Sequence, residues 1–192
     1  MIVVISPETM VANEASIIEA LFDAGLDYYH LRKVEEDYPF DQILSQLSPS
    51  IRNKIRVHGA HRHLNERWGV LGHSKDGEHI HPKENSRSIH KLKQAADLEA
   101  AYFLYAPVFP SISKPGHKPE QELAELEPWL LKLKQQSKQV LALGGVAYEN
   151  AAKCMRAGFS GVALKGSFWS QDEATRIDYF KKVWSVVNNH TY

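Results

Sequence analysis

The chain has 192 residues, with 23 basic and 23 acidic side chains, and therefore a formal net charge of zero. Such a balance gives no general attraction for nucleic acid or for an anionic membrane, and no apolar run reaches the ~18 residues of a membrane-spanning helix. The one cysteine, Cys154, excludes an internal disulfide. We expect a cytoplasmic protein with a single domain over residues 1–192 that acts on a small molecule.

Short apolar or β-branched runs bounded by turn residues predict strands, and longer amphipathic stretches predict helices. In chain order, the eight predicted strands cover residues 2–6, 27–32, 55–58, 69–72, 86–90, 102–109, 139–143 and 161–164. The predicted helices cover residues 13–24, 40–47, 120–136, 149–157 and 172–187. The polar stretch 75–86 predicts a loop.

This alternation of strands and helices is typical of parallel β/α units. Residues 140–143 (Val-Leu-Ala-Leu) are continuously apolar, which indicates a strand buried on both faces. Eight such units predict an α/β fold that closes into a parallel (β/α)8 TIM barrel. The alternative, if the fourth and fifth strands are wrong, is an open doubly wound sheet of six strands.

Glycines follow the last two predicted strands. Gly144 and Gly145 come after the seventh strand, and Gly166 comes after the eighth. Glycine lets backbone amides approach an anion closely, and the loops after strands 7 and 8 are a frequent phosphate site in these barrels. We therefore expect a phosphate to bind through the backbone at these three residues.

Two other predicted strand ends carry groups that suit an anion. Ser111, Ser113 and Lys114 follow the sixth strand and offer two hydroxyl donors and a positive charge. His30 and Arg32 share one face at the end of the second strand. Arg32 is expected to meet either an anionic substrate group or a nearby carboxylate such as Glu35 or Glu36.

These strand ends resemble the thiamine-phosphate synthase and TenI-type thiazole tautomerase superfamily. Residues 107–114 (Pro-Val-Phe-Pro-Ser-Ile-Ser-Lys) are similar to the family's proline-x-phenylalanine stretch followed by two hydroxyl residues and a lysine. Residues 142–146 with Asn150 resemble its phosphate loop, and residues 161–164 resemble its eighth strand. Residues 30–32 (His-Leu-Arg) resemble the end of its second strand, where glutamine usually replaces His30.

The resemblance implies a synthase that joins a hydroxymethylpyrimidine diphosphate to a thiazole phosphate, releasing diphosphate with the help of Mg²⁺. It assigns Arg32 and Lys114 to the diphosphate, with Ser111 and Ser113 in the same loop. It assigns the monophosphate to the backbone of Gly144, Gly145 and Gly166. The phosphorylated small molecule is then the expected partner.

The family's Mg²⁺ carboxylates are not retained in the same places. Val57-His58-Gly59 stands where the family has an asparagine–aspartate pair, and only Asp76 follows the fourth strand. Mg²⁺ prefers oxygen ligands, so both the cofactor and the synthase activity are open. A TenI-type tautomerase, which needs only a phosphate site and an acid/base, is the first alternative. A non-catalytic thiazole-phosphate-binding protein is the second.

The ten histidines offer candidates for that acid/base. His30 and His117 are the best placed, followed by His58 and His90. Histidine is also a common ligand of Zn²⁺, so a metal-dependent hydrolase is a third possibility in principle. For that case the candidate ligands are the histidines after the third and fourth strands: His58, His61, His63, His73, His79 and His81. A homodimer is compatible with so short a barrel.

Overall fold

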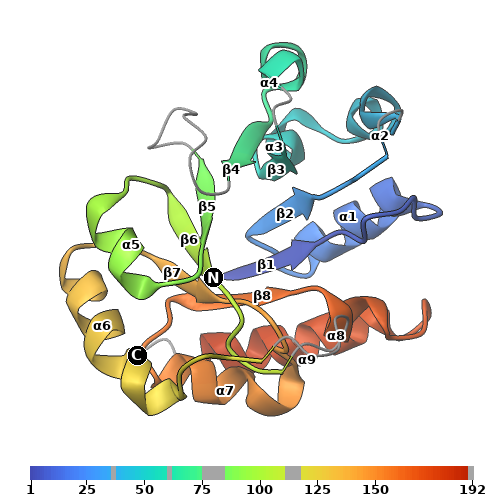
Figure 1. Cartoon of the computed structure of the whole chain (residues 1–192). Coiled ribbons are helices and arrows are strands. Elements are labelled where there is room, and N and C mark those ends of the chain that lie inside the picture. The colour runs from blue at the N-terminus through green and yellow to red at the C-terminus, as the bar shows by residue number, and fades with distance from the viewer. Residues whose placement is uncertain (36–37, 60–61, 75–84, 111–117, 190–192) are drawn as a thin grey trace.

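A computed structural model describes residues 1–35, 38–59, 62–74, 85–110 and 118–189. Its strands form one closed parallel barrel in sequence order, with β8 paired to β1 (Figure 1). The strands are β1 (Ile2–Ile5), β2 (Tyr28–Leu31), β3 (Ile55–His58), β4 (Leu71–Ser74), β5 (Ser86–Ile89), β6 (Tyr102–Tyr105), β7 (Val140–Ala142) and β8 (Gly161–Leu164). The prediction of a single-domain (β/α)8 barrel is therefore confirmed, and the open six-stranded sheet is wrong.

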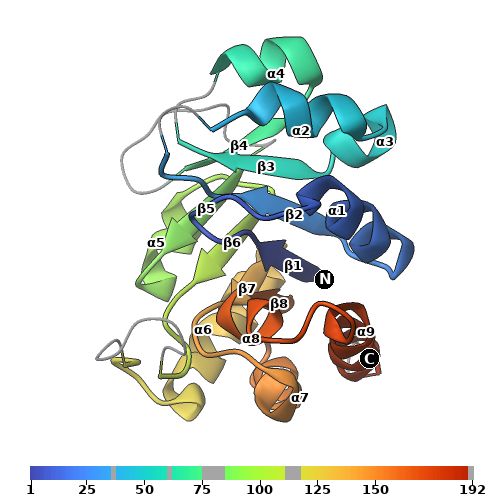
Figure 2. The same cartoon turned by 90° about the vertical axis from the view of Figure 1, so that its right-hand side faces the viewer.

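Helices surround the strands on the outside, as the two perpendicular views show (Figures 1 and 2). They are α1 (Glu14–Asp23), α2 (Phe40–Gln46), α3 (Pro49–Arg52), α4 (Arg62–Trp68), α5 (Leu92–Asp97), α6 (Leu123–Gln135), α7 (Tyr148–Arg156), α8 (Gly166–Trp169) and α9 (Arg176–Asn188). The predicted helices correspond to α1, α2, α6, α7 and α9. The other four were not predicted, because four to seven residues carry too little amphipathic pattern.

The fourth strand lies two residues later than predicted, at Leu71–Ser74 instead of 69–72. Gly69 has a positive φ of 72° and its amide donates to the carbonyl of Asn65, so it belongs to the turn that ends α4. The side chain of Asn65 also donates to the carbonyl of Val70 at 2.7 Å. The shift matters because it places His73 inside a strand rather than in the following loop.

Two apolar cores result from the alternation of side chains along the strands. The larger core fills the space between barrel and helices, and includes Ile2, Val4 and the buried thiol of Cys154. A smaller core lies inside the barrel and consists of Val3, Ile5, Tyr102, Leu104, Leu141 and Ala163. Because these residues come mainly from β1, β6, β7 and β8, the apolar part of the interior lies on one side.

The remaining side of the interior is polar. His30, Arg56, His73 and Ser86 are all buried in the strands β2 to β5. The guanidinium of Arg56 lies over the ring of Tyr28, with 4.4 Å between Cζ and the ring centroid. Among the described residues, no helix is long and apolar enough to cross a membrane.

Candidate active site at the carboxyl ends of the strands

Three charged side chains meet at the carboxyl ends of β8, β1 and β2, which are neighbouring strands. Glu8 follows β1, Arg32 follows β2 and Lys165 follows β8. The carboxylate oxygen Oε1 of Glu8 is ion-paired with Nη1 of Arg32 and lies 3.1 Å from Nζ of Lys165. Each of the three side chains is about one-quarter to one-third exposed. Glu8 thus occupies the place between two cations at the barrel mouth.

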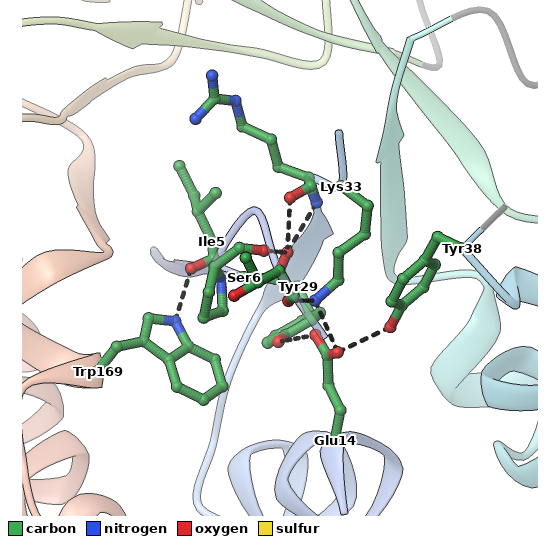
Figure 3. Close-up of polar contacts among 10 residues, drawn as sticks. Ile5, Ser6, Glu14, Tyr29, Lys33, Tyr38 and Trp169 are labelled. Carbon is green, nitrogen blue, oxygen red and sulfur yellow. Dashed lines mark hydrogen bonds and ion pairs between the residues drawn. The ribbon is translucent and has the colours of Figure 1, made fainter. Parts of the chain in front are cut away.

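The backbone at Arg32 is fixed by Ser6, the residue that follows β1. The amide of Arg32 donates to Oγ of Ser6 at 2.8 Å, and the amide of Ser6 donates to the carbonyl of His30 at 2.8 Å. On the other side of β1, Nε1 of Trp169 donates to the carbonyl of Ile5 at 2.8 Å (Figure 3). These bonds join the ends of β1 and β2 to each other and to the end of α8, and so fix the backbone from which Arg32 extends.

Lys33 points away from the mouth, into a buried polar network behind β2 (Figure 3). Its Nζ lies 2.8 Å from a carboxylate oxygen of Glu14, and both side chains have no exposed surface. The hydroxyls of Tyr29 and Tyr38 donate to the same carboxylate at 2.8 Å each. Burial, with the charge of Glu14, raises the pKa of both phenols. Lys33 therefore anchors β2 to α1 and is not a ligand-binding residue.

The Gly144-Gly145 turn follows β7, next to the end of β8 along the rim. Both residues have positive φ values, of 88° and 65°. A Cβ on Gly145 would lie 2.7 Å from Cβ of Phe109 and closer still to the carbonyl oxygen of Pro110. The segment after β6 packs directly on this turn, where the amide of Phe109 donates to the carbonyl of Gly144 at 3.0 Å. Close packing and backbone conformation both require glycine here.

The amides of this turn are available to a ligand. Within the described part of the chain, the amides of Gly144, Gly145 and Val146 donate to no backbone carbonyl. The side chain of Asn150 on α7 holds this turn. Its Nδ2 donates to the carbonyl of Gly145 at 2.9 Å, and its Oδ1 accepts from the amide of Ala147 at 2.8 Å. Amides held in this way can bind an anion without a rearrangement of the loop.

Gly166 and Ser167 begin α8, directly after Lys165. The hydroxyl of Ser167 donates to the carbonyl of Val146 at 2.7 Å, which ties the loop after β7 to that after β8. The rim thus presents a continuous series of groups along four neighbouring strands. We call this series the anion arc: Gly144, Gly145, Lys165, Glu8 and Arg32.

A second group of polar side chains lies deeper, inside the barrel. Nδ1 of His30 lies 2.9 Å from Nε2 of His58, and Nε2 of His30 lies 2.5 Å from the hydroxyl of Tyr102. His73 on β4 stacks on His58 with 4.1 Å between ring centroids. Its two ring nitrogens lie 2.7 Å from Oγ of Ser86 and 2.8 Å from Oγ of Ser88. We call His30, His58 and His73 the histidine triplet.

The triplet is arranged along the barrel axis by the strand register. His30 pairs with Arg56 of β3, and His58 pairs with His73 of β4, so His58 lies nearer the carboxyl end than His30. His30 and His73 are buried, while His58 is partly exposed. Burial, together with the positive charge on His73, His58 and Arg56, lowers the pKa of His30 well below its usual range. His30 is therefore neutral at physiological pH.

The other predicted site residues divide into two groups. Ser111, Ser113, Lys114, His117 and Asp76 lie outside the described residues, as do His61, His79 and His81. Their predicted roles therefore stay predictions. His63 and His90 are described and exposed. His90 follows β5, and its Nδ1 lies 2.9 Å from the carbonyl oxygen of Ala106, which follows β6.

Sequence reasoning missed several residues that contact the anion arc or the histidine triplet. Arg32 is paired with Glu8, which follows the adjacent strand β1, whereas Glu36, one of the two carboxylates expected, lies outside the described residues. Tyr102, Ser86 and Ser88 bind the histidines but lie in strands taken only as core. Period-two alternation from Arg56 to His58 on β3 was a signal that could have placed His58 inside the barrel.

The described residues do not fit the Mg²⁺ that the family resemblance implies. Mg²⁺ requires oxygen ligands, mainly carboxylates. The ends of β3 and β4 present the imidazoles of His58 and His73 instead, and imidazole suits transition metals. The nearest described carboxylate at the mouth, Glu8, is already held by two cations.

A closed parallel barrel with its polar groups gathered at the carboxyl ends of the strands defines a TIM-barrel protein with a rim site. Residues 84–168 match the family model described as thiamine monophosphate synthase. A curated thiamine-phosphate synthase of Methylobacillus flagellatus is 33% identical over 78 residues, which cover 41% of this chain and 35% of that protein. Part of the chain is therefore similar to the thiamine monophosphate synthase/TenI family. The aligned part is about a third of the curated relative's length.

Solved structures agree on the fold over nearly the whole chain. Thiamine phosphate pyrophosphorylase from Bacteroides thetaiotaomicron has a TM-score of 0.77 at 24% identity, covering 97% of each chain. The protein of the same name from Pyrococcus furiosus has a TM-score of 0.75 at 14% identity, covering 100% of this chain and 96% of that one. At these identities the likeness shows the barrel alone.

Proposed function

We propose that this chain is a thiamine-phosphate synthase-like enzyme, which joins a hydroxymethylpyrimidine diphosphate to a thiazole phosphate with release of diphosphate. The observation that carries the proposal is the anion arc. It sets the amides of Gly144 and Gly145 beside two cations along four neighbouring strand ends. A monophosphate at the glycine turn and a second anionic group at Arg32 would each meet suitable partners.

In this proposal the carboxylate of Glu8 occupies the position of a substrate anion. This carboxylate neutralises Arg32 and Lys165 when no substrate is bound. A diphosphate carries more negative charge than one carboxylate and displaces it, as Arg and Lys then bind the phosphate oxygens. Fixed cations also stabilise the charge that builds on diphosphate as it leaves. Lys114, Ser111, Ser113 and Gly166 are proposed to complete the two anion sites.

The experiment is a coupling assay with the purified, untagged chain. Hydroxymethylpyrimidine diphosphate and thiazole phosphate are supplied with and without Mg²⁺, and thiamine phosphate and diphosphate are both measured. Equal amounts of the two products are expected. Arg32→Gln should lower kcat/KM by at least about tenfold, whereas Arg67→Gln, which breaks an exposed ion pair with Asp41, should leave it unchanged. The absence of product from the unmodified chain would reject synthase activity.

A second function is favoured by the contact between His30 and His58. Two imidazoles 2.9 Å apart, of which the outer one reaches the mouth, form a short path for a proton. Such a pair suits a TenI-type tautomerase acting on a thiazole carboxylate phosphate, with His58 as the acid/base and His30 as its partner. Isomerisation without coupling would support it. Tight binding of thiazole phosphate with neither reaction would identify a non-catalytic binding protein.

A further inference from the structure

Three imidazoles converge inside the barrel from three neighbouring strands. His30 comes from β2, His58 from β3 and His73 from β4. One ring nitrogen of each lies within 4.8 Å of those of the other two. The ring centroids are 5.1 Å apart for His30 and His58, 4.9 Å for His30 and His73, and 4.1 Å for His58 and His73.

The separations of His30 from the other two rings are close to those of a metal site, whereas the stacked rings of His58 and His73, at an interplanar angle of 26°, would have to rotate apart. A tetrahedral ion with metal–nitrogen bonds of about 2.0–2.1 Å holds its ligand nitrogens about 3.4 Å apart and its imidazole centroids about 5 Å apart. Nδ1 of His30 and Nε2 of His58 are already 2.9 Å apart. The widest pair would have to close by about 1.4 Å, which small rotations of side chains achieve.

For His30 and His73, the other ring nitrogen has a partner of the kind that orients metal ligands. Nε2 of His30 lies 2.5 Å from the hydroxyl of Tyr102, and Nδ1 of His73 lies 2.7 Å from Oγ of Ser86. A histidine that binds a metal through one nitrogen usually donates through the other. Nδ1 of His30 and Nε2 of His58 face each other, and Nε2 of His73 would complete the set of ligands. Ser88, now 2.8 Å from Nε2 of His73, would be displaced.

A metal ion binds the neutral form of an imidazole, and two of the three rings, those of His30 and His73, are buried. The guanidinium of Arg56 is turned away along the barrel. Nη1 of Arg56 donates to the carbonyls of Asn53 at 3.0 Å and Ile55 at 3.1 Å, toward the amino end of β3.

From this geometry we propose that His30, His58 and His73 bind one divalent transition-metal ion of the Zn²⁺ class inside the barrel. Three imidazoles leave a fourth position for water or a ligand group, as in catalytic rather than structural zinc sites. That position faces the mouth, because His58 is the one partly exposed member of the triplet. The site goes beyond the proposed synthase function, since the anion arc shares no residue with it, although His30 and His58 are also the pair on which the tautomerase alternative depends.

The test uses the full chain without a histidine tag, after removal of metal with a chelator. Zinc binding is measured by equilibrium dialysis with elemental analysis, and Co²⁺ is added to report the ligand geometry by visible absorption. We expect one zinc per chain and a tetrahedral cobalt spectrum. His58→Gln should weaken zinc binding by at least about a hundredfold, and His73→Gln should do the same.

Two control variants separate this site from other histidines. His90→Gln changes an exposed residue outside the triplet, and the double variant His79→Gln/His81→Gln changes residues outside the described part of the chain. Both should bind zinc like the unmodified protein. Gly145→Ala, designed against the phosphate turn, should also keep its zinc, so failure of the proposed function and failure of the metal site are distinguishable.

Less than half an equivalent of zinc in the unmodified chain would overturn the proposal, and so would unchanged affinity in His58→Gln. Circular dichroism of each metal-free variant checks that the barrel is folded. If the triplet variants do not fold, X-ray absorption of the zinc-loaded unmodified chain decides instead. A shell with three imidazoles supports the site, and a shell dominated by oxygen or sulfur rejects it.

Discussion

Nε2 of His30 and the hydroxyl of Tyr102 lie 2.5 Å apart, which joins β2 to β6 across the interior of the barrel. Burial lowers the pKa of the imidazole and raises that of the phenol, so both groups stay neutral. A short hydrogen bond between two neutral, buried groups contributes more to stability than an exposed one, because water cannot replace either partner.

Tyr102→Phe removes this bond and leaves a ring nitrogen of His30 without a partner. We expect the free energy of unfolding to fall by about 1–3 kcal/mol. Urea denaturation of the metal-free chain provides the measurement. The matched control is Tyr148→Phe at an exposed position, which should change stability by less than about 0.5 kcal/mol. Equal effects of the two variants would show that the contact does not stabilise the fold.

The depressed pKa of His30 predicts a loss of stability in mild acid. In the unfolded chain His30 titrates near its ordinary value of 6.5, whereas in the folded chain it takes up a proton only at much lower pH. Below pH 6.5 the unfolded state therefore binds more protons, and stability falls by up to about 1.4 kcal/mol per pH unit until the folded-state pKa is reached. Above pH 6.5 this group contributes no pH dependence.

The measurement is the free energy of unfolding at several pH values between neutral and mildly acidic, with the metal-free chain. His30→Gln should flatten the curve in this window. His90→Gln removes an exposed imidazole and should leave the slope unchanged. A slope that survives in His30→Gln would assign the acid sensitivity to other titratable groups, such as the neighbouring His58 and His73.

Glu8 competes with any anion for Arg32 and Lys165. Glu8→Gln removes the competing charge, so we expect inorganic phosphate to bind roughly two- to fivefold more tightly, in keeping with the modest energy of partly exposed pairs. Isothermal titration calorimetry at low ionic strength measures the Kd. Asp41→Asn, which breaks the exposed pair with Arg67, is the control. Weaker phosphate binding in Glu8→Gln would mean that Glu8 orients the cations instead of blocking them.

Gly145→Ala tests the turn after β7. A non-glycine residue at positive φ costs about 1–2 kcal/mol, and here the added Cβ also meets Phe109 at 2.7 Å. Gly69→Ala is matched for φ, at 72°, but its Cβ would meet nothing nearer than Asn53 at 3.4 Å. We expect Gly145→Ala to lose more stability by urea denaturation, and to lose phosphate binding. If Gly69→Ala weakens phosphate binding equally, the turn is not the anion site.

Lys33→Met tests the buried network behind β2. Removing one partner of an ion pair without exposed surface leaves the carboxylate of Glu14 uncompensated, and we expect a loss of about 3–5 kcal/mol. Lys181→Met breaks an exposed pair with Asp178 and should cost no more than about 1 kcal/mol. Thermal unfolding compares the two. A small effect of Lys33→Met would show that this ion pair does not stabilise the fold.

The strand order could be predicted from the sequence because most of the strands are short apolar runs that a glycine or a polar turn ends. Residues 140–143 and 161–164 are continuously apolar, as fully buried parallel strands must be. The fourth strand was placed two residues too early because Leu71–Ser74 (Leu-Gly-His-Ser) contains one large apolar residue. Its burial depends on neighbours from β3 and β5, which no local pattern encodes.

The positions of several candidate residues in the fold could be predicted for the same reason. Arg32, Gly144, Gly145 and Gly166 lie at strand ends, and strand ends follow from the fold. The partner of Arg32 is different, because Glu8 reaches it only through the pairing of β1 with β2. Tyr102 and His30 are separated by 72 positions, and they meet only when the barrel closes around its interior.

The unequal filling of the barrel has a thermodynamic consequence. Val3, Leu104, Leu141 and Ala163 pack one side of the interior, while imidazoles, hydroxyls and a guanidinium occupy the other. Replacing such an enclosed polar group by aliphatic residues of equal volume often makes a protein more resistant to denaturation. A variant in which leucine and valine replace the interior polar residues of β2 to β5 should therefore unfold at a higher temperature. It should also lose whatever chemistry the histidines perform, because stability and activity often oppose each other.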